Sequence, residues 1–138
     1  MSITNLQVIN AALRDINVIS EVEDASAEQG AHAIRKLNQM MEAWKEEDKD
    51  LGWFSQPDTT GDCPIPDWAE LGVSSALAIV LAPKYGASIS PELAMIAEGA
   101  VNVIARKTIS EKLDNQDMSH LPRGSGHFSS GYDITTDI

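Results

Sequence analysis

The sequence predicts an all-α protein, a compact bundle of four main helices with an extended C-terminal tail. Apolar residues recur at helical spacing in four segments, and capping residues stand in front of these segments. The segment from 67 to 86 is also apolar on nearly every side. A helix with almost no polar face must be enclosed by other protein. We therefore expect a bundle built around this third helix.

Composition indicates one domain and excludes several classes of function. The chain has 138 residues, one cysteine and a formal charge of −11, from 21 acidic and 10 basic residues. A domain of this length folds without a disulfide or a metal. No apolar run approaches the roughly 20 residues that span a membrane. We expect a soluble protein without membrane contact. Its acidic surface should repel DNA, although solubility alone also explains such a charge.

The first two helices are predicted over about residues 5–17 and from Ser26 onwards. Thr4 and Ser26 each begin a capping box, with Gln7 and Gln29 three residues later. The second helix ends in an acidic cluster, where the helix dipole disfavours negative charge. We expect its last turn to fray; alternatively, the acids face a basic partner outside the monomer. The cluster comprises Glu46, Glu47, Asp48 and Asp50.

The third and fourth helices have clear start and stop signals. Asp67 is the expected N-cap of the third helix, with Glu70 completing a capping box, and Gly86 is its expected left-handed stop. Pro83 lacks an N–H and should kink or tighten the last turn. Ser90 should cap the fourth helix, since a proline follows at the first helical position.

The apolar stripes of the four helices predict one shared core. Between the second and third helices, residues 50–66 are expected to form a long loop or a short hairpin with 59–62 at its tip. Connections of this length usually have a function or are mobile. The predicted core residues are Leu13, Leu37, Met41, Trp44, Trp68, Leu77, Leu81, Tyr85 and Ile104.

Composition divides the chain into a helical body, 1–113, and an arm, 114–138. The arm is rich in glycine, serine and aspartate and has no helical period, so it should be disordered alone. Its last seven residues alternate and are rich in β-branched side chains. Such a segment can add a strand to a partner's sheet or place apolar anchors in a groove. We therefore expect the arm to gain order on a partner.

Residue patterns for catalysis are weak. Glu42 and Glu46 lie near one helical face, which leaves a cell-wall hydrolase with paired carboxylates as an alternative. These acids sit at a polar helix end, however, where a solvated face is the simpler interpretation. His120 and His127 match no zinc pattern, and Cys63 has no evident catalytic partner. We predict no catalytic, cofactor-binding or metal-binding residues. The net charge also disfavours a nucleic-acid or regulatory binding module.

Several motifs occur in a characteristic order. They are an Asn-Ala-Ala-Leu helix, the run Leu-Asn-Gln-Met-Met at 37–41 before Trp44, an irregular aromatic loop, Ile-Pro-Asp-Trp at 65–68, Leu-Ala-Pro-Lys-Tyr-Gly at 81–86, and a helix after Ser-Pro at 90–91. Over roughly residues 1–110 this set resembles the tail accessory factor family of short-tailed bacteriophages, which are packaged-DNA stabilisation proteins or head-to-tail adaptors.

The resemblance implies a non-enzymatic structural adaptor in the head-to-tail connector of a virion, made in the host cytoplasm. Neighbouring copies, typically twelve, would form a ring beneath the portal protein. The ring would extend the DNA channel without sequence-specific binding, help to retain the DNA, and receive downstream tail proteins. In this family the C-terminal segment commonly docks on the portal. By position and chemistry alone, the expected portal-binding residues are Arg123, Phe128, Tyr132, Ile134 and Ile138.

Overall fold

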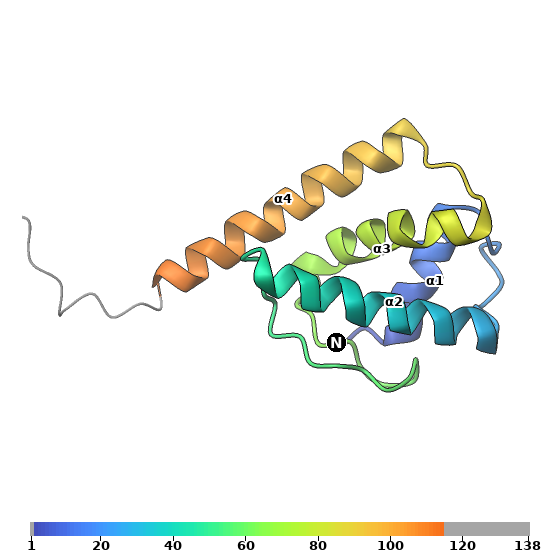
Figure 1. The fold of residues 1–138 in the computed structure, drawn as a ribbon, viewed down its shortest axis with the longest axis horizontal. Coiled ribbons are helices and arrows are strands. Elements are labelled where there is room, and N and C mark those ends of the chain that lie inside the picture. Colours follow the sequence, from blue (N-terminus) through green and yellow to red (C-terminus); the bar gives the residue numbers. More distant parts are fainter. Residues whose placement is uncertain (1, 115–138) are drawn as a thin grey trace, which may run out of the picture.

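The computed structural model describes residues 2–114 and confirms the all-α prediction (Figure 1). Its helices are α1 (Asn5–Asp15), α2 (Ala27–Glu46), α3 (Glu70–Tyr85) and α4 (Pro91–Asp114). A short 3-10 turn, Asp67–Ala69, precedes α3. None of the helices within 2–114 combines the length and the apolar character needed to span a membrane.

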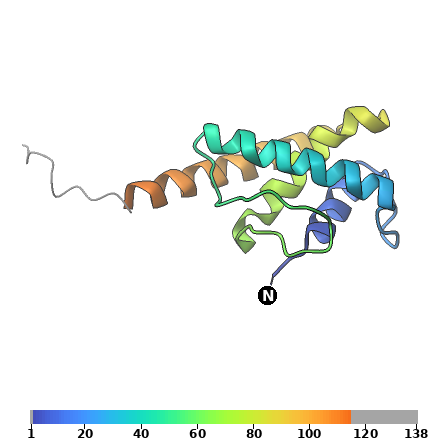
Figure 2. The same ribbon diagram turned by 60° about the horizontal axis from the view of Figure 1, so that its bottom comes forward.

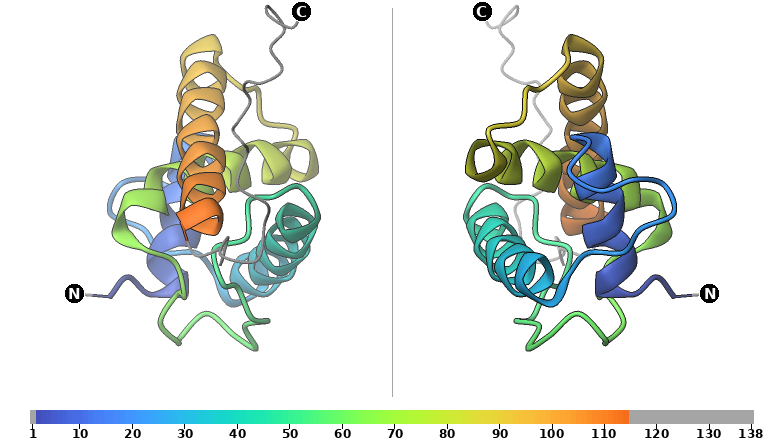
Figure 3. Two further views of the ribbon diagram at one scale, coloured as in Figure 1. Left: turned by 90° about the vertical axis from the view of Figure 1, so that its left-hand side faces the viewer. Right: turned by 90° about the vertical axis from the view of Figure 1, so that its right-hand side faces the viewer.

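Helix α3 is the central element, as its apolar sequence predicts. It contacts α1, α2 and α4, and it lies between α4 on one side and α2 on the other (Figures 1 and 3). The enclosure is incomplete, because Leu71 and Val80 remain exposed. These two residues lie near opposite ends and on opposite sides of α3, so the helix is exposed locally and not along one whole face.

Most of the predicted core side chains are buried between these helices, where each stabilises the fold by about 1.5–3 kcal/mol. The buried members are Leu13, Leu37, Met41, Trp44, Leu77, Leu81 and Ile104. Trp68 and Tyr85 differ from the prediction, since both are only half-buried and pack at the edge of the core. They lie beside the two ends of α3, where fewer helices cover a side chain.

Helices α3 and α4 pack closely because α3 has a glycine at the contact. A Cβ atom on Gly72 would lie 2.5 Å from Cδ1 of Ile104 and 3.2 Å from the carbonyl oxygen of Ala100. Any larger residue at this position would push α4 away. Gly72 thus sets the approach of the two helices.

The capping boxes are confirmed at both predicted positions. The side chain of Thr4 accepts from the Gln7 N–H, that of Ser26 accepts from the Gln29 N–H, and each glutamine side chain accepts from its cap's N–H. The start of α4 is also confirmed, since Ser90 Oγ accepts from the N–H of Leu93 at 3.0 Å. Helix α1, however, ends at Asp15, slightly before the predicted position.

The predicted capping box of the third helix is wrong. No side chain caps the 3-10 turn or α3, because the 3-10 turn shifts the start of α3 to Glu70. At the other end, α3 continues through Pro83 to Tyr85 and stops at Gly86, whose φ is 63°. The Gly86 N–H donates to the carbonyl of Pro83, a three-residue spacing that tightens the last turn as predicted.

The end of α2 is ordered rather than frayed. The N–H of Lys49 donates to the carbonyl of Trp44, and Asp48 adopts a left-handed φ of 62°. Thr108 on α4 donates its hydroxyl to the Asp48 carbonyl at 2.8 Å, and Lys112 forms an ion pair with the Asp48 carboxylate at 3.4 Å. Asp48 therefore meets its basic partner within the same chain.

Candidate interaction surfaces

Residues 47–66, the segment between α2 and the 3-10 turn, run back beside α2 towards the start of the chain (Figure 2). This segment does not form the hairpin considered from the sequence; its isolated β-bridge joins Asp62 to Thr4 instead. The reason is that polar side chains of α1 and α2 supply the hydrogen bonds that a second strand would otherwise provide.

Asn38 on α2 holds the first half of this segment. Its Oδ1 accepts from Nε1 of Trp53 at 3.1 Å and from the N–H of Gln56 at 2.9 Å. Its Nδ2 donates to the carbonyl of Gln56 at 2.9 Å. One side-chain amide therefore satisfies both backbone groups of Gln56 and fixes the buried indole of Trp53.

Asn5 at the start of α1 holds the second half. Its side chain is fully buried, and its Nδ2 donates to Oε1 of Gln56 at 3.0 Å and to the carbonyl of Asp58 at 3.1 Å. Its backbone N–H donates to the carbonyl of Gly61 at 2.9 Å. Thr59 packs close to Gly30 of α2, where a Cβ would lie 3.2 Å from its methyl group. The segment is thus anchored at short intervals.

Phe54 is presented outwards by this anchored segment. Its side chain is 63% exposed, whereas Trp53 before it and Gln56 two residues after it are buried. The Nε2 of Gln56 also donates to the Phe54 carbonyl at 2.9 Å. An aromatic ring on a backbone that is already ordered loses little conformational entropy on binding. Phe54 is therefore a candidate anchor for a partner protein.

A hollow of about 570 Å³ lies between α2 and the anchored segment. Arg35 and Asp58 contribute charge at this hollow. Most of the lining is apolar or small, so the hollow suits a short apolar segment. Its apolar and glycine residues are Leu6, Ala25, Ala27, Gly30, Ala31, Ile34 and Pro57.

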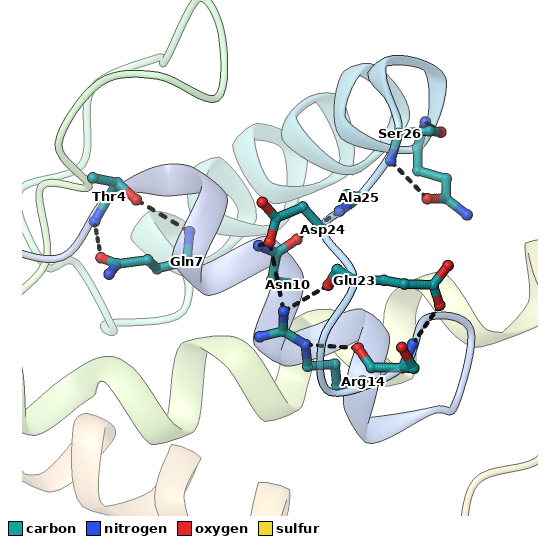
Figure 4. Close-up of polar contacts among 10 residues, drawn as sticks. Thr4, Gln7, Asn10, Arg14, Glu23, Asp24, Ala25 and Ser26 are labelled. Atoms are coloured by element: carbon teal, nitrogen blue, oxygen red, sulfur yellow. Dashed lines mark hydrogen bonds and ion pairs between the residues drawn. The ribbon is translucent and has the colours of Figure 1, made fainter.

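The connection between α1 and α2 is held by two residues of α1 (Figure 4). Arg14 donates to the carbonyls of Ser20 and Glu23, at 3.1 and 2.6 Å. Asn10 accepts from the N–H of Ala25 at 2.8 Å, while its Nδ2 donates to the carboxylate of the preceding aspartate at 3.0 Å. This connection is therefore as firmly anchored as the one between α2 and α3.

Helix α4 contacts α3 on one face, while its opposite face carries a row of exposed apolar side chains. The end of α4 projects beyond α2 and α3 (Figure 1). The exposed side chains are Met95, Ile96, Val103, Ile109 and Leu113. Exposed apolar surface of this extent is typical of a protein–protein contact.

The residues considered for catalysis lie apart from these surfaces. Glu42 and Glu46 are exposed on the last turns of α2, where Glu42 pairs with Lys45 at 3.6 Å. Burial, with a smaller effect of the Glu70 charge, raises the pKa of the Cys63 thiol to about 12, which makes it a poor nucleophile. Within residues 2–114, no three His, Cys, Asp or Glu side chains are grouped as metal ligands.

The expected portal-binding residues all lie outside the described residues. They are Arg123, Phe128, Tyr132, Ile134 and Ile138. His120 and His127 lie outside as well. The anchoring residues Asn5, Asn38 and Arg14 were missed, although one signal was present. Asn38 directly follows Leu37 in the apolar stripe of α2, and a polar residue beside such a stripe needs a partner inside the protein.

Comparison with known families supports the resemblance seen in the sequence. A family profile described as P22 tail accessory factor matches residues 1–135. Comparison with curated proteins gave no match. The match covers the four helices, the anchored segment and most of the arm, so it extends beyond the residues that carried the sequence resemblance. The chain therefore belongs to the P22 tail accessory factor family, whose members are phage tail components.

Proposed function

We propose that this protein is a non-enzymatic structural adaptor of a phage head-to-tail connector. Twelve copies of it form a ring beneath the portal protein in the virion. The ring extends the DNA channel, stabilises the packaged DNA without reading its sequence, and receives downstream tail proteins. Residues 1–113 form the body of each subunit, and residues 114–138 form the arm that docks on the portal.

The family match over residues 1–135 is the observation that carries this proposal, because it includes the body together with most of the arm. The charge of −11 adds support, since an acidic channel wall lets DNA slide without adhering. The exposed apolar face of α4 and the exposed side chain of Phe54 supply contact surfaces that a free monomer does not need.

The direction of α4 supports the assignment of the arm. Thr108 and Lys112 tie α4 to the end of α2 through Asp48, and α4 then continues to Asp114 at the edge of the body (Figure 1). This course of α4 supports an arm that begins where the helix ends. Many arms on one ring would bind a symmetric portal with strong avidity, even if each arm bound weakly.

Deleting residues 115–138 tests the proposal. We expect the truncated chain to keep its helical circular dichroism and to lose binding to purified portal rings, measured by analytical ultracentrifugation. Normal attachment of the truncated chain would refute the role of the arm. Within the full chain, alanine at Phe128, Tyr132 and Ile134 should weaken binding, whereas alanine at the matched polar positions Ser129 and Thr135 should not.

A second measurement distinguishes the adaptor from the hydrolase considered above. The full chain is incubated with cell-wall substrate beside its Glu42→Gln and Glu46→Gln variants. An adaptor gives no turnover in any of the three. Turnover by the natural chain that either substitution abolishes would replace the proposal with a hydrolase.

A further inference from the structure

Gly99 stands in the interior of α4, where nothing among residues 2–114 accounts for it. Glycine is the least favourable residue in a helix interior apart from proline. A Cβ at Gly99 would meet nothing within 4 Å among the described residues, whereas one at Gly72 would clash with α4. Gly99 therefore differs from Gly72, whose role is internal packing. A glycine on the outer side of a helix allows another chain to approach closely.

Three of the four side chains that flank this glycine at helical spacing on α4 are apolar, and the fourth is the exposed Asn102. Met95, Ile96 and Val103 lie four or three residues away along the helix, so they border the position of the missing side chain. All three are exposed, Met95 by 74%. Arg106 lies one further turn along, is exposed, and forms no ion pair with another residue of 2–114. We call this surface the Gly99 notch, a largely apolar position on α4 with the cation Arg106 seven residues after Gly99 and the anion Glu92 seven residues before it.

The connection between α1 and α2 carries the complementary features. Val22 is 93% exposed at its tip, between Glu21 and Glu23. The N–H of Glu23 donates to the carbonyl of Ser20, which closes a tight turn around Val22. The Arg14 bonds described above hold this turn on α1 (Figure 4). An apolar knob between two acids thus stands on an ordered support.

Negative charge accumulates beside Val22. Glu21 forms no ion pair within the described part of the chain. Burial and, to a smaller extent, the Glu21 carboxylate raise the pKa of Asp15. Repulsion between the two acids is relieved when a cation approaches. The Gly99 notch offers such a cation in Arg106, beside the position where Gly99 carries no side chain.

We propose that the Gly99 notch on α4 receives Val22 of a second copy of this chain, with Glu21 of that copy beside Arg106. This inference rests on the proposed ring and names the surfaces that join neighbouring subunits. The notch and the turn belong to different elements, and α4 packs on α3 while the turn lies at the end of the molecule where α2 begins (Figure 1). Such a contact is heterologous and repeats from copy to copy.

Exchanging the charges of Arg106 and Glu21 in the full-length protein tests the contact. The occupancy of portal rings by added chain is counted by native mass spectrometry. Arg106→Glu and Glu21→Arg should each reduce the filling of the ring about tenfold. Their combination should restore filling to within about threefold of the natural chain. No restoration in the double variant would overturn the proposal.

Filling the Gly99 notch with a side chain provides a second, independent test. Gly99→Leu covers this position and replaces a poor helix former with a good one. We expect it to unfold at the same or a higher urea concentration than the natural chain, yet to fill portal rings about tenfold less well. Binding of a single copy per portal, measured at a large excess of portal, should be unchanged. Loss of this single-copy binding would overturn the proposal, because the notch would then face the portal.

Cross-linking separates this proposal from the proposed function. A chain with Val22→Cys and Gly99→Cys, oxidised after ring assembly, should give a ladder of covalent oligomers, whereas each single variant should not. Native Cys63 is buried and does not interfere. Filled rings without the ladder would overturn the contact and leave the ring intact. If the natural chain does not bind the portal, the proposed function fails, and the same oxidation of the concentrated free chain then decides whether the contact exists.

Discussion

Replacing Asn38 by alanine tests whether one side chain holds the segment between α2 and α3. The substitution removes three hydrogen bonds and leaves the indole N–H of Trp53 and the N–H and carbonyl of Gln56 without partners. Trp53 and Gln56 are buried, so each group loses a partner that water replaces poorly. An unsatisfied buried group costs about 1–3 kcal/mol. Because Asn38 itself is half-buried, the low end applies, and we expect a loss of about 3 kcal/mol.

Two further variants separate this cause from a general effect of substitution on α2. Asn38→Asp keeps the oxygen that accepts from Trp53 and from the Gln56 N–H but lacks the Nδ2 donor, so it should cost only about 1–2 kcal/mol. Gln39→Ala, at the exposed neighbouring position, should change stability by less than about 0.5 kcal/mol.

Urea unfolding followed by circular dichroism measures these free energies, and hydrogen exchange of the Trp53 indole reports the anchored segment directly. We expect the Trp53 indole proton to exchange much faster in Asn38→Ala while α1 and α3 remain protected. A loss of stability below about 1 kcal/mol, or equal effects of alanine and aspartate, would refute the assignment of Asn38 as the anchor.

Three other predictions concern the core and its titrating groups. Burial raises the pKa of Cys63 to about 12, so a thiol reagent at pH 8 should label it only after unfolding; rapid labelling of the native chain would contradict its burial. Burial and the charges of Lys84, Lys36 and Arg35 lower the pKa of His32, so the unfolded chain binds the proton more readily. Stability is therefore present above pH 6.5 and should fall as the pH decreases below it, and His32→Gln should flatten this part of the profile measured by thermal unfolding. Gly72→Ala should lower the free energy of unfolding by about 1–2 kcal/mol, since overpacking against Ile104 exceeds the gain in helix propensity. Adding Ile104→Val to this variant should recover part of the lost free energy, and an unchanged free energy of urea unfolding in Gly72→Ala would refute the close contact.

The helices and most of their core could be predicted because they depend on short-range pattern. The capping boxes at Thr4 and Ser26 join residues three positions apart, and the stripe that includes Leu37 and Met41 repeats within one helix. The same local reasoning failed at the start of α3, where a 3-10 turn replaced the cap expected at Asp67. It also placed Trp68 in the core. Periodicity shows which face of a helix is apolar, but it does not show which end of the helix the neighbouring helices leave uncovered.

The candidate surfaces could be predicted only in part. The polar composition of 114–138 and a long aromatic connection are visible in the sequence, yet the side chains that hold that connection are not. Asn5 meets Gln56 across 51 positions of the chain, and Asn38 meets it across 18. Pairings of this kind depend on how α1 and α2 lie beside each other, and no local pattern reports them.

By itself, the amino-acid sequence determined that this protein is helical, and its ordered motifs indicated the tail accessory factor family. Backbone hydrogen bonding and apolar periodicity act within a few residues, which is why both conclusions needed no coordinates. Tertiary structure alone decided that the α2–α3 connection is anchored, that Phe54 and Val22 point outwards, and that none of residues 2–114 covers Gly99. Each of these depends on which residues of distant segments meet, because exposure is a property of the packed chain and not of any one stretch of it.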